Sequence, residues 1–123
     1  MILVDTSAWI DHLRVGDAAL RKLLERGQVL AHPCVIGELA MGNLKQRDLV
    51  LSALQDLPRA VVALEDEVLR FIVDRGLSGL GIGYSDAHLL AAVQLTPDAL
   101  LWTRDKRLGE IAARLSLAAV PAE

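Results

Sequence analysis

The chain opens with Met1-Ile-Leu-Val-Asp5-Thr-Ser-Ala-Trp9, and this stretch decides the expected fold. The apolar run of residues 2–4 stops abruptly at the polar residues 5–7, which is typical of a buried strand that ends at a polar turn. Short apolar strands that alternate with helices predict a mostly parallel sheet covered by helices on both faces. We therefore expect an α/β fold.

The rest of the chain repeats this alternation. We expect further short strands at residues 29–31, 60–62, 100–102 and 117–120. The helices expected between them cover residues 8–13, 18–26, 33–41, 46–54, 65–75, 86–94 and 106–115. Glycine-rich residues 78–84 form a loop, and Ser85 is the expected N-cap of the helix that follows.

Length and composition predict one domain spanning residues 1–123. Hydrophobic residues make up 53% of the chain and aromatic residues 3%, which suits helices packed on a small sheet. No apolar stretch is long enough for a membrane helix, and the N-terminus lacks a signal-peptide pattern. Because Cys34 has no second cysteine to pair with, we expect a cytoplasmic protein with no membrane association.

Two acidic residues, Asp5 and Asp105, lie just after expected strands. Ligands of open α/β sheets bind at the carboxyl ends of the strands, where the strand order reverses. Each acid also has a simpler interpretation, since Asp5 could cap the next helix and Asp105 could stabilise a helix dipole by about 0.3–1 kcal/mol. Those interpretations leave unexplained why both acids follow strands.

Two more acids, Glu38 and Asp86, are expected on apolar helix faces. A buried carboxylate costs several kcal/mol unless it is paired, protonated or bound to a metal. A hard divalent cation such as Mg²⁺ or Mn²⁺, held jointly by Asp5, Glu38, Asp86 and Asp105, would remove this cost. The simpler interpretations are an exposed Glu38 and a first-turn Asp86. Ser7 and Thr103 are candidate supporting residues that orient the carboxylates or a bound water.

The net charge of −3 gives only a weak argument against nucleic-acid binding, because the acids of a metal site would account for part of it. The candidate contacts to RNA phosphates are Arg14, Arg104, Lys106 and Arg107, although ordinary solvated charge explains each of them equally well. The three histidines show no zinc-like spacing with one another or with Cys34, so we assign them no role. The glycines of the 78–84 loop do not follow a strand directly and form no dinucleotide motif.

Four segments together resemble the PIN-domain ribonucleases, and specifically the VapC toxins of bacterial toxin–antitoxin pairs. A strand running into Asp5 and a hydroxyl residue resembles the first motif, and the helix bearing Glu38 resembles the second. The segments around Asp86 and around Thr103 and Asp105 are similar to the third and fourth. In order, the four segments are residues 2–10, 32–42, 81–92 and 100–108.

The resemblance covers nearly the whole chain and implies a three-layer PIN-like fold with five parallel strands. It implies that Asp5, Glu38, Asp86 and Asp105 are the catalytic residues that bind Mg²⁺ or Mn²⁺, for hydrolysis of RNA phosphodiester bonds by a metal-activated water. It also implies a VapB-like antitoxin, a homodimer and a larger toxin–antitoxin assembly. The one departure is Leu108, where the family often has phenylalanine, and we expect no effect on the chemistry.

Two other functions remain open at this point. The first is a PIN-fold module that binds RNA or a partner without cutting, although retention of all four acids argues against it. The second is a phosphatase or phosphoacceptor domain with Asp5 as the reacting group. A phosphatase pattern expects an acid where the chain has Ser7, and the paired acids of a receiver domain are not evident.

Overall fold

The computed structural model describes residues 1–119 of the chain. Within this range the chain has three strands and seven helices, with two helices after the first strand, four after the second and one after the third. The strands are β1 (Ile2–Val4), β2 (Val29–Leu30) and β3 (Leu100–Trp102). The helices are α1 (Thr6–Val15), α2 (Ala18–Glu25), α3 (Pro33–Met41), α4 (Arg47–Gln55), α5 (Glu65–Asp74), α6 (Tyr84–Leu95) and α7 (Lys106–Arg114).

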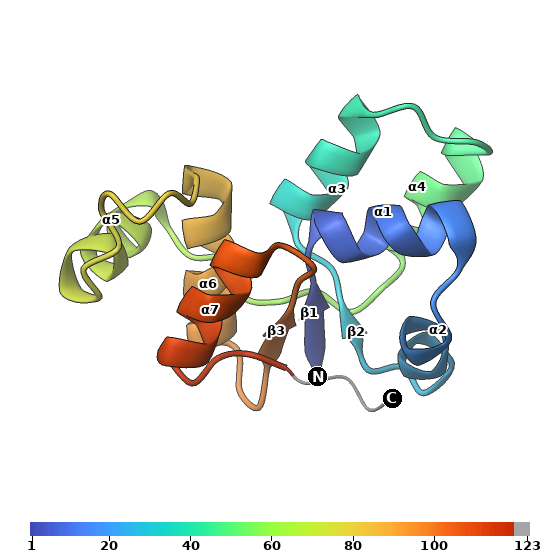
Figure 1. Cartoon of the computed structure of the whole chain (residues 1–123). Helices are drawn as coiled ribbons and strands as arrows, with labels where there is room; N and C mark the ends of the chain where they lie inside the picture. The colour runs from blue at the N-terminus through green and yellow to red at the C-terminus, as the bar shows by residue number, and fades with distance from the viewer. Residues whose placement is uncertain (120–123) are drawn as a thin grey trace.

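The sheet has the order β2-β1-β3, and both pairings are parallel. Strand β1 therefore lies in the middle, with its two neighbours coming from later parts of the chain. The three strands point the same way, and α1, α3 and the turn to α7 begin at their carboxyl ends (Figure 1). This is the point of a parallel sheet at which ligands bind.

The prediction of strands at residues 60–62 and 117–120 is wrong, because the described residues form only isolated bridges there. Arg59 makes a single parallel bridge to Ala31, and Ala118 makes one to Leu101. Val61 and Val62 are exposed at 45% and 46%, so these β-branched residues cover no sheet face. Val120 lies outside the described residues. Within residues 1–119 the sheet has three strands, with a single-bridge segment at each edge, rather than five full strands.

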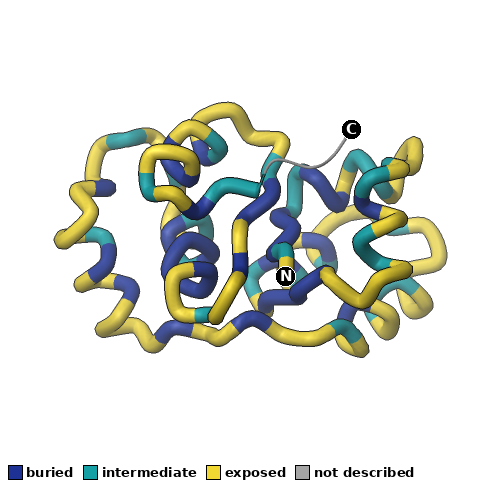
Figure 2. Tube along the Cα trace, turned by 90° about the horizontal axis from the view of Figure 1, so that it is seen from below, coloured by how far each residue is buried: buried dark blue, intermediate teal, exposed yellow. Residues whose placement is uncertain are grey.

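The α/β class is confirmed, since parallel strands are flanked by helices. Helix α6 packs on β3 and α5 packs on α6, while α3 contacts α1, α4 and α6. Residues 89–93 of α6 are buried without interruption, because β3 and α5 cover different sides of the helix. Buried residues gather in the middle of the molecule and exposed residues at its margins (Figure 2).

The predicted start of the helix at Asp86 is wrong. Helix α6 begins at Tyr84, with Gly83 rather than Ser85 in the N-cap position. The Asp86 carboxylate Oδ2 accepts a hydrogen bond from the Gly83 amide at 3.2 Å, so the helix is capped from inside its first turn. Asp86 is therefore the third residue of α6, two residues further into the helix than expected.

None of the helices in the described part of the chain has both the length and the apolar character that crossing a membrane requires.

Candidate active site

Asp5 lies at the end of the central strand and is the buried acid of the site, with 5% of its surface exposed. It is the N-cap of α1, and its Oδ1 accepts a hydrogen bond from the Ala8 amide at 3.1 Å. Capping alone would explain an exposed aspartate, but it satisfies only one oxygen of a buried one. The remaining acceptor capacity is directed at neighbouring side chains.

Two hydroxyl groups hold the Asp5 carboxylate from either side. Ser7 Oγ donates to Oδ1 at 2.7 Å, and Thr103 Oγ1 donates to Oδ2. The same hydroxyls accept hydrogen bonds from backbone amides of the turn after β3, with Arg104 N bonded to Ser7 Oγ at 2.9 Å and Asp105 N bonded to Thr103 Oγ1 at 3.0 Å. This network fixes the carboxylate and ties the turn that carries Asp105 to it.

Glu38 extends from α3 on the side facing α1. The prediction that it sits on a buried face is wrong, because its side chain is exposed, whereas the buried residues of α3 are Val35 and Leu39. Thr6 Oγ1 donates to Glu38 Oε1 at 2.7 Å, which brings this carboxylate to the first residue of α1. The sequence analysis missed Thr6, although its place directly after Asp5 in a polar run was a usable signal.

Asp86 lies in the first turn of α6 and is half-buried. Burial raises the pKa of its carboxyl group, and the charges of Asp105, Asp5 and Glu38 raise that pKa further, against the lowering effect of the Gly83 amide. Three acids from other parts of the chain are thus close enough to act on Asp86. Carboxylates gathered in this way repel one another unless a cation lies between them.

Asp105 is exposed at the rim of the group and caps α7, with its Oδ1 accepting from the Leu108 amide at 3.0 Å. Asp105 therefore does both: it caps α7, and its charge raises the pKa of Asp86. Asp5 and Asp105 follow β1 and β3, and Glu38 and Asp86 lie on α3 and α6. All four side chains offer only oxygen atoms as ligands. This donor set fits Mg²⁺ or Mn²⁺.

The four candidate RNA-contacting cations are spread around this site. Arg104 pairs with Asp17 and lies 3.9 Å from an Asp11 oxygen, so its charge is already balanced. Arg107 lies over Gly81, where an added Cβ would come within 2.0 Å of its Nη1. Gly81 has φ +80°, which also favours glycine. Arg14 and Lys106 are exposed, and Arg14 lines a groove beside Glu38.

Replacing Thr103 by valine is expected to lower the affinity of these carboxylates for Mn²⁺ by about 10–100-fold, because the carboxylate of Asp5 loses the hydroxyl that orients it. Thr96→Val is the matched control, since Thr96 Oγ1 also bridges two segments but does so between Ala92 and Val61. The control should lose stability and keep its affinity for Mn²⁺. Calorimetric titration with Mn²⁺ measures the affinity of both variants, and equal losses in the two would contradict the orienting role.

Comparison with known proteins places this geometry in a family. Residues 2–114 match the family model described as PIN domain. The chain is 52% identical over 118 residues to the protein named Ribonuclease VapC32 from Mycobacterium tuberculosis strain CDC 1551 / Oshkosh, covering 96% of this chain and 95% of that one. The protein of the same name from strain ATCC 25618 / H37Rv matches to the same extent.

The chain therefore belongs to the PIN-domain family. Within that family it is of the VapC type, as the level and extent of identity to the VapC32 proteins show. The resemblance inferred from the four motifs is confirmed at both levels.

Proposed function

We propose that the protein is the toxin of a type II toxin–antitoxin pair, an endoribonuclease that depends on Mg²⁺ or Mn²⁺. Relatives named Ribonuclease VapC32, alike over nearly their whole length, support the substrate class. The observation that carries the proposal is the hydrogen-bond network that brings the acids together: Thr103 links Asp5 to the turn that carries Asp105, and Thr6 holds Glu38 next to Asp5. The raised pKa of Asp86, on which the other three carboxylates act, supports it. Two acids at strand ends and two on neighbouring helices repel one another when they lie close together, unless they hold a cation.

Each side chain has a distinct part in the proposed reaction. Asp5 would be the central metal ligand, with its carboxylate held in one orientation by Ser7 and Thr103. Glu38 and Asp86 would complete the ligand set from α3 and α6, and Asp105 would serve at the exposed rim. When bound, the metal lowers the pKa of a water molecule and neutralises the negative charge that develops on the phosphodiester. Water would attack the phosphorus on the side opposite the leaving 3′ oxygen. The bond to that oxygen would break, and the product on the other side of the cut would carry a 5′ phosphate.

A groove of about 860 Å³ runs from Glu38 between α1, α3 and α4. It exposes the apolar side chains Ile10 and Leu13, at 42% and 38%, and has Arg14 and Lys45 in its wall. Such a surface suits an extended or helical peptide with apolar anchors. We propose it as the site of a VapB-like antitoxin, whose tail would reach the acids, and expect a homodimer within a larger toxin–antitoxin assembly.

Chelation of divalent metal by EDTA is expected to abolish cleavage of a single-stranded RNA, and added Mn²⁺ or Mg²⁺ to restore it, because the carboxylates alone cannot generate a nucleophile at neutral pH. Products are separated by gel electrophoresis, and their 5′ ends are tested with a phosphate-dependent exonuclease. Cleavage that persists in EDTA and in an Asp5→Asn variant would identify a contaminating nuclease. RNA binding without any cleavage would favour the non-catalytic module.

A further inference from the structure

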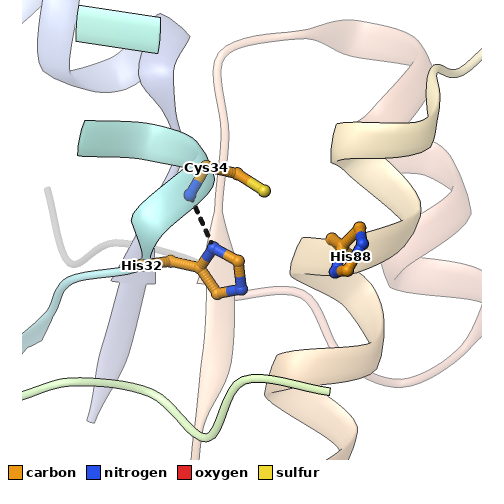
Figure 3. A group of neighbouring side chains, drawn as sticks. All are labelled: His32, Cys34 and His88. Carbon is orange, nitrogen blue, oxygen red and sulfur yellow. Dashed lines mark hydrogen bonds between the residues drawn. The ribbon is translucent and has the colours of Figure 1, made fainter. Parts of the chain in front are cut away.

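Three side chains outside the acid site form a second cluster of metal-ligating groups. His32 and Cys34 stand at the start of α3 and His88 stands on the neighbouring helix α6, with the Cys34 sulfur directed toward α6 (Figure 3). One ligand atom from each residue lies within 4.8 Å of the others. His32 and His88 are 56 residues apart in the sequence, so spacing alone gave no sign of this cluster.

The cluster contains two buried nitrogen atoms with no hydrogen-bond partner among residues 1–119, His32 Nε2 and His88 Nδ1. His32 is only 1% exposed, so water does not reach its ring from the bulk. A buried polar atom without a partner is unfavourable and uncommon in native proteins. Two such atoms facing one gap indicate a ligand that both rings could bind.

We propose that His32, Cys34 and His88 form a binding site for Zn²⁺ that is separate from the carboxylate site. Two imidazoles and a thiolate are the donors that Zn²⁺ prefers, whereas Mg²⁺ takes oxygen donors. The two sites would therefore select different metals. With three protein ligands, a water molecule fills the fourth position of the zinc.

The spacing of the cluster suits this ion after a small contraction. Tetrahedral zinc with bonds of about 2.0–2.3 Å holds its ligand atoms roughly 3.3–3.8 Å apart. The upper limit of 4.8 Å in the structure therefore has to shrink by about 1 Å. Rotation of the short Cys34 side chain and small shifts of the two rings achieve this without unfolding either helix.

Zinc binding would change the protonation of His32 and of Cys34. His32 Nδ1 accepts a hydrogen bond from the Cys34 amide at 3.0 Å, so the neutral ring carries its proton on Nε2. Zinc on Nε2 requires that proton to leave and Nδ1 to take one up, which breaks the bond to an amide in the first turn of α3. Zinc on Cys34 displaces the thiol proton. One proton is therefore released to solvent for each ion bound.

The state of the metal-free groups is consistent with this exchange. Burial lowers the pKa of His32 to about 4, so its ring is neutral at physiological pH. Burial raises the pKa of the Cys34 thiol, so this sulfur keeps its proton until a metal displaces it.

An ion in this position would join the two helices that carry acids of the proposed active site. Cys34 and Glu38 are one helical turn apart on α3, and His88 follows Asp86 by two residues on α6. A bound Zn²⁺ would therefore fix the separation of α3 and α6. We expect it to raise the melting temperature of the protein independently of Mg²⁺.

The direct test is titration of the metal-stripped full chain with Co²⁺, which replaces zinc and gives a thiolate charge-transfer absorption band. We expect the band with one equivalent of Co²⁺ in the unsubstituted protein and in an Asp5→Asn variant. It should disappear in Cys34→Ala and weaken at least 10-fold in apparent affinity in His88→Ala. His12→Ala is the matched control, because His12 Nδ1 also accepts a backbone amide but lies on α1; it should keep the band.

A second measurement keeps the proposal testable if a variant fails to fold. Zn²⁺ should slow alkylation of Cys34 by iodoacetamide at least 10-fold and raise the melting temperature by about 5 °C or more, including in Asp5→Asn. Mg²⁺ should do neither in that variant. Absence of the thiolate band with unchanged alkylation would overturn the proposal, and would mean that a water molecule satisfies the two nitrogens. None of these measurements uses RNA cleavage, so a negative result would reject the zinc site without bearing on the proposed nuclease activity.

Discussion

Asp5→Asn is expected to lower metal-dependent RNA cleavage by about 100-fold or more while the protein stays folded. The substitution removes the negative charge that the cation needs at the centre of the site. Asparagine keeps a side-chain oxygen that can accept from the Ala8 amide, and it is a good N-cap, so α1 keeps its start. Cleavage rates at saturating Mn²⁺ and circular dichroism measure the two effects.

The matched control for Asp5 is Asp17→Asn. Asp17 is the N-cap of α2 and accepts from the Leu20 amide at 3.0 Å, so the two substitutions perturb the same kind of cap, and Asp17→Asn also removes the ion pair with Arg104. Asp17→Asn should change the cleavage rate by no more than about 3-fold. Similar losses of activity in both variants would show that capping, rather than cation binding, explains Asp5.

Asp86→Asn is expected to remove cleavage to a similar extent and yet stabilise the metal-free protein at pH 7. Because burial and three neighbouring carboxylates raise the pKa of Asp86, its ionised form is less favourable in the folded chain than in the unfolded chain. The penalty is present above the raised pKa and is lost as the pH falls through it. The melting temperature should therefore rise by roughly 2–5 °C at pH 7, and the gain should vanish near pH 3–4.

Glu67→Gln is the matched control for this prediction. Glu67 is the third residue of α5 and accepts from the Leu64 amide at 2.8 Å, as Asp86 does from Gly83 in α6. Away from the acid cluster, a first-turn carboxylate favours the helix, so this variant should be slightly less stable at pH 7. Thermal melts from pH 3 to 8 without metal compare the two, and a loss of stability in both would argue against carboxylate repulsion at Asp86.

The sequence predicted the parts of the fold in which local pattern and tertiary structure agree. Strands β1 and β3 were predicted because a buried parallel strand is a short apolar run with a sharp polar end, and both runs end at site residues. Residues 60–62 have the same apolar, β-branched composition but lie beyond the edge of the sheet, where only Arg59 pairs. Composition does not tell an edge segment from a central strand.

The site was predicted less completely than the fold, because its details depend on contacts between distant segments. The four acids stay a predicted site, with Asp105, Asp5 and Glu38 close enough to affect the pKa of Asp86. The burial expected for Glu38 is wrong, because its face on α3 is one position away from the core. The start of α6 was misplaced because Asp86 caps the helix from its third position, which a search for an N-cap serine does not detect. Thr6 and the histidine–cysteine cluster are visible only in three dimensions.

The most direct test of the shared cation site is a crystal structure of the protein soaked in Mn²⁺, with the ion located from its anomalous scattering. We predict an anomalous peak bonded to Asp5 and Asp86, with Glu38 in its ligand shell and Asp105 at the exposed side. A fully occupied peak elsewhere on the molecule, or no peak between these carboxylates at Mn²⁺ concentrations that support cleavage, would contradict the account.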